Sequence, residues 1–313
     1  MTHSPCFSLY RALKASVVLA ALTLSMPASA ALKIFACEPE WGALAKELGG
    51  SDVDVYTATT AQQDPHQIQP RPSLLARFRQ SDLSVCTGAE LEIGWLPVLM
   101  QSAGNPKIQS GQPGYFEASS AVTMLEVPTH LDRADGDVHP YGNPHIQTDP
   151  RNIGKVAKAL AQRLADLDGA HAADYAKRAA DFDARWSAAV AKWALQAAPL
   201  KDQPVITYHK EWAYLFDWLG IKLAGTLEPK PGIPPSAAHL QDLLNGLKTQ
   251  PAKMILYSAY QDNRAATWLS DRAKLPAVQL PFTVGGDKGT DDLLGLYQVT
   301  IDKLLAGLKA SAP

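Results

Sequence analysis

The long amphipathic helix predicted in the middle of the chain constrains the fold more than any other feature. Within residues 172–195, apolar side chains recur at steps of three or four positions, at Tyr175, Ala179, Phe182, Trp186, Val190 and Trp193. This spacing aligns them along one side of an α-helix and leaves the charged residues on the other side. At 1.5 Å per residue the helix would be about 35 Å long, which is the size of a small domain. The stripe therefore predicts a rigid helix that packs along its length.

Strands and helices alternate on both sides of this helix. Before it, strands are predicted at 32–37, 53–57 and 83–86, and helices at 41–48, 73–80 and 92–101. After it, strands are predicted at 204–208, 221–224, 254–258 and 277–280, and helices at 211–219, 236–247, 265–273 and 291–305. Such alternation is typical of βαβ units in a mostly parallel sheet. The expected fold is therefore α/β, with two lobes that each hold a mostly parallel sheet flanked by helices, joined by the long helix.

The segment at 102–150 interrupts this pattern. It is rich in Gly, Pro, Ser and Asp, and we expect only one strand in it, at 122–127, with an exposed loop at 132–142. A helix at 153–167 then closes the first half. The predicted division is a first lobe at 31–170, a connecting helix at 171–198 and a second lobe at 199–313.

Residues 1–30 are predicted to be a secretory signal peptide. Arg11 and Lys14 precede an apolar stretch at 15–26, which is too short to span a bilayer. Ala28-Ser29-Ala30 then matches the small-residue pattern of a cleavage site. We therefore expect export, cleavage after Ala30, and no membrane-spanning segment in the rest of the chain.

Charge and cysteine content narrow the function and the compartment. The chain has 29 Lys and Arg against 31 Asp and Glu, and the basic residues do not cluster, so a nucleic-acid partner is not expected. Cys37 and Cys86 remain after cleavage, and each ends a predicted strand. They either form one disulfide, as an oxidising compartment allows, or stay buried as free thiols.

Two short segments nearly repeat each other, and each presents one histidine. They read DPHQIQP at 64–70 and NPHIQTDP at 143–150, and they place His66 and His145 directly after a proline. Proline fixes its own φ and restricts the residue before it, so both imidazoles belong to stiff turns. His209 directly follows the strand predicted at 204–208, and ligands of open α/β sheets bind beyond the carboxyl ends of strands. Three imidazoles on separate loops predict a zinc-type site between the lobes.

A fourth ligand is harder to identify. Asp287 follows Gly285-Gly286, which allow the backbone to turn tightly, and it is the candidate we name first. The alternatives are water or one of three other carboxylates, Glu228, Asp64 and Asp292. His139 is either an auxiliary ligand or a solvated loop histidine.

On these residues the chain resembles the solute-binding proteins of ABC importers for zinc and manganese. The resemblance covers the signal peptide, the early Asp64-Pro65-His66 turn, the second Pro-His turn, the long helix and the histidine at a strand end. It implies two α/β lobes around a rigid helix and one metal ion in the cleft. It also implies a periplasmic monomer without enzymatic activity that delivers the ion to a membrane permease. His66, His145 and His209 take the three ligand positions, and this nitrogen set favours Zn²⁺ over Mn²⁺.

The chain also departs from the family pattern. It reads Gly-Asn-Pro-His at 142–145 where many relatives have Asp-Pro-His, and Thr-Val-Gly-Gly at 283–286 where some relatives place a liganding aspartate. The His-rich loop of many zinc importers is missing. Two other functions remain open. A secreted zinc hydrolase would also use three histidines and a water, although no general-base or G-x-S-x-G motif occurs. A siderophore- or corrinoid-binding protein would share the long helix.

Overall fold

Each half of the chain builds one four-stranded parallel sheet in the computed structural model, which describes residues 30–132, 134 and 136–311. The signal peptide predicted at 1–30 lies outside the described residues, apart from Ala30. Residues 31–313 group as one unit. Among the described helices, none combines the length and the apolar character that crossing a bilayer requires.

The two sheets have the same strand order. The first contains β1 (Leu32–Ala36), β2 (Val53–Thr57), β3 (Leu83–Cys86) and β4 (Tyr115–Glu117), in the order β2-β1-β3-β4. The second contains β5 (Pro204–Thr207), β6 (Lys222–Thr226), β7 (Met254–Ser258) and β8 (Ala277–Leu280), in the order β6-β5-β7-β8. All neighbouring strands are parallel. The predicted fold class of two α/β lobes with mostly parallel sheets is confirmed.

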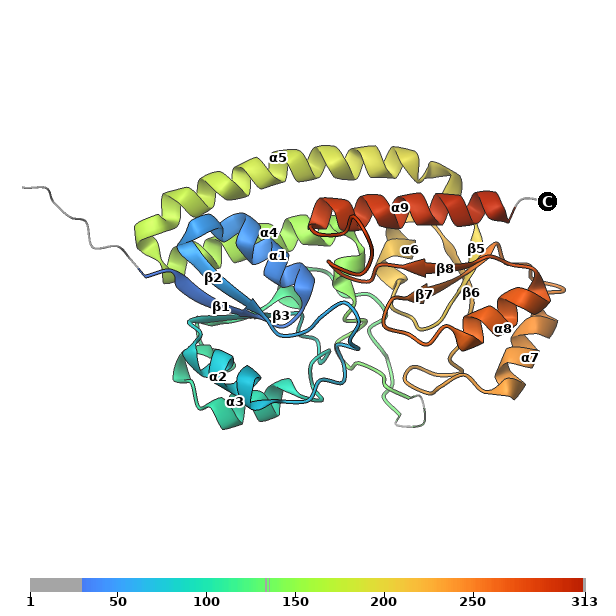
Figure 1. Ribbon diagram of the computed structural model, residues 1–313, viewed down its shortest axis with the longest axis horizontal. Helices are drawn as coiled ribbons and strands as arrows, with labels where there is room; N and C mark the ends of the chain where they lie inside the picture. Colours follow the sequence, from blue (N-terminus) through green and yellow to red (C-terminus); the bar gives the residue numbers. More distant parts are fainter. Residues whose placement is uncertain (1–29, 133, 135, 312–313) are drawn as a thin grey trace, which may run out of the picture. The chain divides into compact units, whose positions relative to one another are not determined.

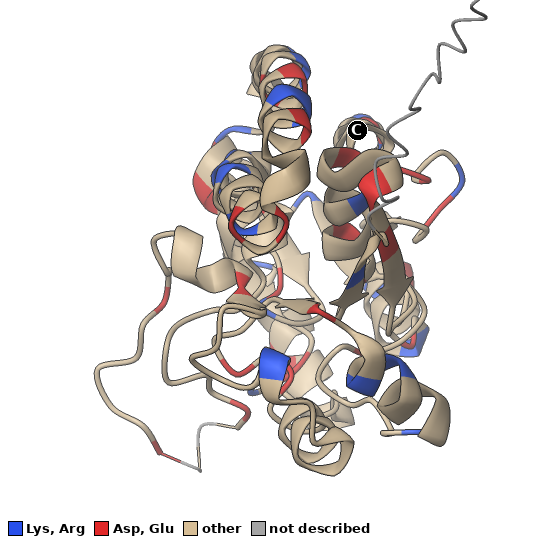
Figure 2. Cartoon of the chain, turned by 90° about the vertical axis from the view of Figure 1, so that its left-hand side faces the viewer, with Lys and Arg blue, Asp and Glu red and all other residues tan. Residues whose placement is uncertain are grey.

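Helices cover both faces of each sheet. They are α1 (Pro39–Gly49), α2 (Pro72–Gln80), α3 (Leu96–Ala103), α4 (Pro150–Leu167), α5 (Ala172–Gln196), α6 (Ala213–Leu219), α7 (Ala237–Gly246), α8 (Arg264–Ala273) and α9 (Leu293–Ala310). Figure 1 shows α5 running from the first lobe to the second, with α9 beside it over the second sheet. The helices α2 and α3 lie on the opposite side of the first sheet, as α7 and α8 do for the second. Basic and acidic residues are interspersed along the helices (Figure 2).

The apolar stripe of α5 is buried in a core that both lobes share. Tyr175, Phe182, Trp186 and Trp193 are at most 3 % exposed, and they belong to one cluster with the inner faces of both sheets. The Trp186 ring lies 5.3 Å from the ring of Tyr297 in α9, and its indole nitrogen donates to the Pro150 carbonyl at 2.7 Å. The long helix therefore packs against both lobes, as the stripe predicts.

In the first lobe one predicted strand is wrong, and one predicted helix begins later than expected. The fourth strand is Tyr115–Glu117, which pairs with β3, and no strand forms at 122–127 among the described residues. Glu126 has a φ of 51°, and such a left-handed conformation interrupts a strand. The helix predicted at 92–101 begins only at Leu96, because Pro97 occupies its first turn rather than its middle.

Of the two states considered for the cysteines, the structure has the disulfide. Cys37 and Cys86 are bonded, with 4.8 Å between their Cα atoms. Their strands β1 and β3 are neighbours, and Ala36 pairs with Val85 immediately before the two cysteines. Both cysteines are fully buried in the core between the first sheet and the helices α2 and α3, which we call the outer core.

Three buried glutamates follow the carboxyl ends of these strands. Glu38, Glu40 and Glu92 are each at most 3 % exposed. The Glu92 carboxylate accepts from the Thr87 and Gly88 backbone amides at 2.7 and 3.1 Å. Glu40 accepts from the Thr283 hydroxyl, which belongs to the other lobe. Burial raises the pKa of Glu40 and of Glu92 to about 7.

We expect this burial to make the apo protein less stable as the pH rises. Glu40 has a folded pKa of about 7 and an unfolded pKa of 4.5. Between these values the unfolded chain has already lost the proton, so the free energy of unfolding falls as the pH rises through this range. Glutamine cannot ionise, so Glu40→Gln should reduce the loss between pH 5 and pH 8 by on the order of 2 kcal/mol. Urea titrations of both proteins across this range measure the effect.

A matched control is Glu47→Gln, the same substitution at an exposed position of the same helix, where the carboxylate pairs with Arg185 at the surface. It should leave the pH dependence of unfolding as it is in the parent protein. If Glu40→Gln and the parent lose stability equally with rising pH, the pKa of Glu40 is not raised on folding.

Candidate metal centre

His66 lies in the loop after β2, and its ring is fixed by the aspartate of its own turn. Asp64 Oδ1 accepts from the His66 backbone amide at 3.0 Å and lies 2.7 Å from His66 Nδ1. The ring therefore keeps only Nε2 for a ligand. Gly94 lets a neighbouring loop approach closely, because a Cβ there would lie 2.7 Å from the His66 carbonyl oxygen. Pro65 is held as well, since its carbonyl accepts from the Trp95 indole at 2.9 Å.

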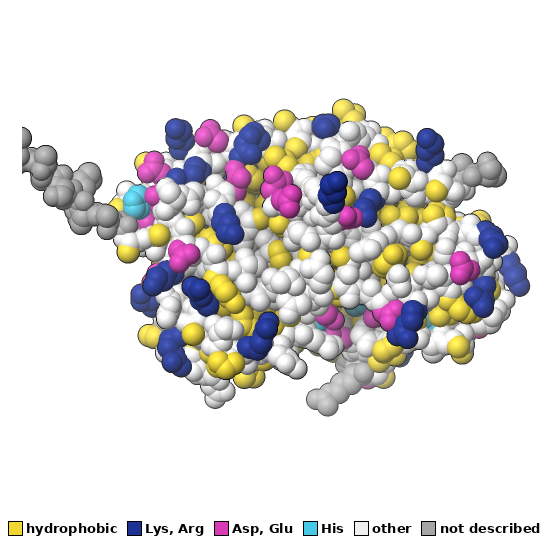
Figure 3. Space-filling view, viewed as in Figure 1, with side chains coloured by type: hydrophobic (Ala, Val, Ile, Leu, Met, Phe, Trp, Pro, Cys, Tyr) yellow, Lys and Arg dark blue, Asp and Glu magenta, His cyan; other side chains and the backbone are white. Residues whose placement is uncertain are grey.

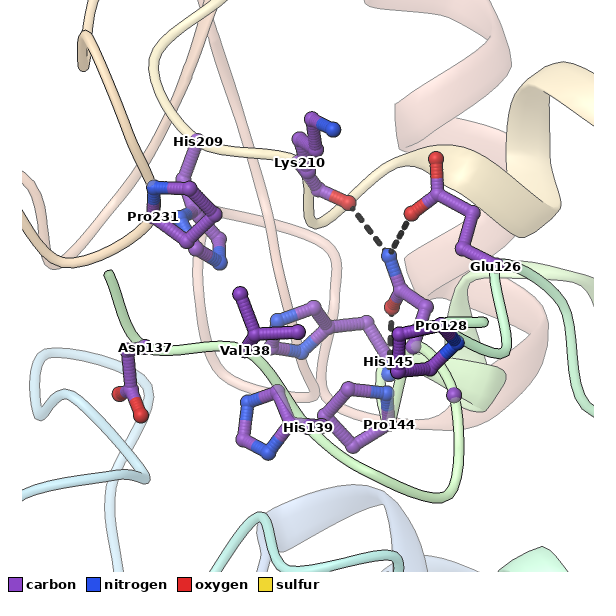
Figure 4. Close-up of a pocket in the computed structure, with 12 residues that line it drawn as sticks. Glu126, Pro128, Asp137, Val138, His139, Pro144, His145, His209, Lys210 and Pro231 are labelled. Atoms are coloured by element: carbon purple, nitrogen blue, oxygen red, sulfur yellow. Dashed lines mark hydrogen bonds between the residues drawn. The ribbon is translucent and has the colours of Figure 1, made fainter. Parts of the chain in front are cut away.

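His145 repeats this turn with asparagine in the place of aspartate. Asn143 Oδ1 accepts from the His145 backbone amide at 3.0 Å, while the Asn143 amide group donates to Glu126 and to the Lys210 carbonyl (Figure 4). The His145 ring is 1 % exposed, and neither ring nitrogen has a hydrogen-bond partner within the described part of the chain. Burial lowers its pKa well below the ordinary value, and the nearby His66 and His209 lower it further. The imidazole is therefore neutral and has a free lone pair.

His209 lies two residues after the end of β5, at the carboxyl end of the second sheet. Its Nδ1 lies 2.7 Å from Glu228 Oε2, and Glu228 also accepts from the Gly232 backbone amide at 3.1 Å. Burial lowers the pKa of His209, but the hydrogen bond to Glu228 and the charge of Glu211 outweigh it, so the pKa is raised. A carboxylate on the second ring nitrogen is the usual arrangement around a metal-ligating histidine.

The structure brings the three predicted histidines together between the lobes. One ligand atom of each lies within 4.8 Å of the other two. The ring centroids are 5.2 Å apart for His66 and His145, 5.4 Å for His145 and His209, and 5.9 Å for His66 and His209. Phe282 closes the far side, with its ring 5.5 Å from that of His145. Three nitrogens at this spacing can converge on one ion of the size of Zn²⁺.

The carboxylates considered as a fourth ligand lie elsewhere or have another role. Asp287 forms an ion pair with Lys303 of α9, and it is not in any described group of ligand atoms around the histidines. The Lys303 side chain lowers the pKa of Asp287. Asp292 caps α9 by accepting from the Gly295 amide at 2.7 Å. Asp64 and Glu228 lie 2.7 Å from the Nδ1 atoms of His66 and His209, so they orient these two imidazoles.

His139 is closer to the site than a solvated loop histidine would be. Its ring centroid lies 5.4 Å from that of His66, and its Nε2 is buried without a hydrogen-bond partner in the described residues. Burial lowers its pKa to about 4, and the neighbouring His66 adds to this shift. The sequence does not predict the position of His139, because contacts with the second lobe position its loop.

Glu228→Gln should weaken metal binding without removing a ligand. The amide oxygen can still accept from His209 Nδ1, but the negative charge that strengthens the imidazole as a ligand is lost. Outer-shell changes of this kind cost about 10- to 100-fold in metal affinity. Competition with a chelator measures the dissociation constant. The control is Glu117→Gln, which changes a glutamate whose Oε1 accepts from the Tyr115 hydroxyl at 2.9 Å. Equal affinities of Glu228→Gln and the parent would contradict the role assigned to Glu228.

Comparisons with known proteins give one consistent result. The family described as "Zinc-uptake complex component A periplasmic" (ZnuA) matches residues 34–309. The manganese ABC transporter substrate-binding lipoprotein PsaA of Streptococcus pneumoniae is 22% identical over 295 residues, which cover 91% of this chain and 92% of PsaA. The high-affinity zinc uptake system protein ZnuA of Brucella abortus (strain 2308) is 31% identical over 111 residues, 36% of this chain and 33% of that protein.

Solved structures of similar proteins have the same fold. A crystal structure of ZnuA superposes with a TM-score of 0.73 at 22% identity, over 88% of this chain and 99% of that chain. The substrate-binding protein FpvC of Pseudomonas aeruginosa, in complex with Mn²⁺, gives a TM-score of 0.74 at 22% identity, over 90% of this chain and 99% of that one. The two-lobed architecture is thus shared along nearly the whole described chain.

Proposed function

This chain belongs to the family of periplasmic zinc-uptake complex component A proteins, and we propose on that premise that it captures Zn²⁺ and delivers it to a membrane permease. Membership makes it a periplasmic metal-binding component of an ABC importer. This family consists of transport proteins, not of enzymes. The choice of zinc, the ligand residues and the delivery step are our proposal. Export through the signal peptide at 1–30 is part of it.

The observation that carries the proposal is the unpartnered His145 imidazole between two oriented ones. Burying two polar nitrogens without a hydrogen bond costs free energy, so a fully buried imidazole without partners indicates a ligand that is bound during function. His66 and His209 have their Nδ1 atoms fixed by carboxylates, which leaves Nε2 of each for the same ion. Little has to move when the ion binds.

The donor set supports zinc over manganese. Manganese prefers carboxylate and carbonyl oxygen, whereas imidazole nitrogen suits zinc. Asp64 and Glu228, the carboxylates that contact His66 and His209, are already bonded to histidine nitrogens. We propose that water, rather than Asp287, completes the shell of four ligands. Manganese remains the second candidate, because the name of the relative PsaA states that metal.

Calorimetric titration of the apo protein with Zn²⁺ and with Mn²⁺ tests the proposal. We expect one Zn²⁺ per chain, bound more tightly than Mn²⁺, with proton release that appears as a dependence of the heat on the buffer. Tighter binding of Mn²⁺ would overturn the assignment of zinc. Absence of binding by either ion would overturn the site itself.

A further inference from the structure

We propose that Asp137 and His139, together with His66, form a second metal position through which the ion enters and leaves the site. We call His66, Asp137 and His139 the outer position, and His66, His145 and His209 the inner position. The inference rests on the proposed function, because it concerns the route of the same ion. It adds two residues and a defined intermediate to that route.

The ligand atoms of the outer position already lie close together. One atom from each of His66, Asp137 and His139 lies within 4.8 Å of the other two. The Nε2 atom of His139 is buried and unpartnered in the described residues, as both nitrogens of His145 are. Asp137 supplies an oxygen donor and a negative charge, which offsets part of the charge of a divalent ion as it loses water.

The two positions follow one another from solvent to core. Asp137 is exposed, His139 is half-buried, and His66 has a side chain 12 % exposed, whereas His145 is 1 % exposed. Figure 4 shows Asp137, Val138 and His139 on one stretch of chain beside the His145 ring. Figure 3 shows histidine atoms at the surface low in the view, between the two lobes. An ion from solvent therefore meets the outer ligands first.

The stretch that carries the outer ligands is fixed to the opposite lobe. The Asp137 amide donates to the Pro231 carbonyl at 2.9 Å. Gly136, with a φ of 87°, allows the approach, because a Cβ there would lie 2.3 Å from the same carbonyl oxygen. The neighbouring Gly232 amide donates to Glu228, which also holds His209. Both positions are thus placed by the same turn of the second lobe.

Only one of the two positions can use His66 at a time. Its Nδ1 is bonded to Asp64, so Nε2 is the single nitrogen left, and a neutral imidazole nitrogen has one lone pair. An ion bound by His139 and Asp137 can therefore stay on His66 while His145 and His209 replace the outer ligands. Release follows the same exchange in reverse. At equilibrium the chain binds one ion. The outer position therefore affects the rates of uptake and release, not the stoichiometry.

Rates of zinc exchange test the outer position in the full chain. His139→Ala and Asp137→Asn should each slow the release of Zn²⁺ to EDTA, and its uptake, by at least about tenfold, since a partner of a metal site contributes about 10- to 100-fold. The dissociation constant should change much less, because the inner ligands remain. His130→Ala is the matched control, an exposed histidine before the same loop that should leave both rates unchanged.

A second background keeps the result independent of the inner position. In a His209→Ala protein, residual Zn²⁺ binding should depend on the outer ligands and weaken at least about tenfold further when His139→Ala is added. Unchanged rates in the first experiment, or no further loss in the second, would overturn the outer position. A large loss of affinity in His139→Ala with unchanged uptake would also overturn it and make His139 an inner ligand. If the parent protein binds no Zn²⁺, the proposed function fails first.

Discussion

Replacement of His145 by alanine is expected to raise the dissociation constant for Zn²⁺ by more than about 100-fold, because the change removes a direct ligand and outer-shell partners alone contribute about 10- to 100-fold. Among the three histidines, His145 should show the clearest loss of Zn²⁺ affinity when it is replaced. Its ring nitrogens have no hydrogen-bond partner in the described residues, so the side chain has no other bonding role. Its burial also keeps water from replacing it easily.

Competition between the apo protein and a chelator of known affinity measures this loss. His130→Ala, which changes an exposed histidine, should bind Zn²⁺ like the parent. Melting of both apo variants checks that the fold is kept, since the emptied space beside Phe282 costs some stability. A triple His66→Ala, His145→Ala, His209→Ala variant that bound Zn²⁺ with the affinity of the parent would refute the inner position altogether.

Removal of the disulfide should lower the free energy of unfolding by about 4 kcal/mol in the loop-entropy description. Cys37 and Cys86 are separated by 49 residues, so the bond closes a long loop in the unfolded chain. Replacing both by alanine also empties space in the outer core, where the two cysteines are fully buried. Urea unfolding of the double alanine variant measures the sum of the two effects.

Reduction separates the covalent effect from the packing effect. Treating the parent protein with dithiothreitol breaks the bond but keeps both sulfur atoms in the core, so most of the loss should already appear in the reduced parent. The double alanine variant should not respond to dithiothreitol. Equal unfolding midpoints for the oxidised and the reduced parent would show that the bond contributes nothing to stability.

Local patterns predicted the features of the site that depend on short stretches of chain. The two Pro-His turns follow from the sequence because proline restricts its neighbours. The structure adds the role of Asp64 and Asn143, which stand two residues before their histidines. Both side chains then accept from the histidine backbone amide, at 3.0 Å in each case. His209 was found from its place after a strand. These inferences need only a few consecutive residues.

Contacts between distant residues decided the features that the sequence did not predict. His139 reaches the site because the loop at 136–139 bonds to Pro231 of the other lobe. Asp287 stays away because Lys303, on the last helix, pairs with it. The sequence does not predict the strand at Tyr115–Glu117, because three residues give too short a pattern to recognise without the neighbouring β3.

The last helix has a consequence for the order in which the chain can fold. Tyr297 of α9 packs on Trp186 and Trp193, and it donates to the Gln147 carbonyl, 150 positions earlier in the chain. The first lobe therefore completes its packing only when the C-terminal residues arrive. Contacts over such separations slow folding, because a large loop must close before they form. We therefore expect folding to be completed only after α9 is available, which is compatible with the export proposed above.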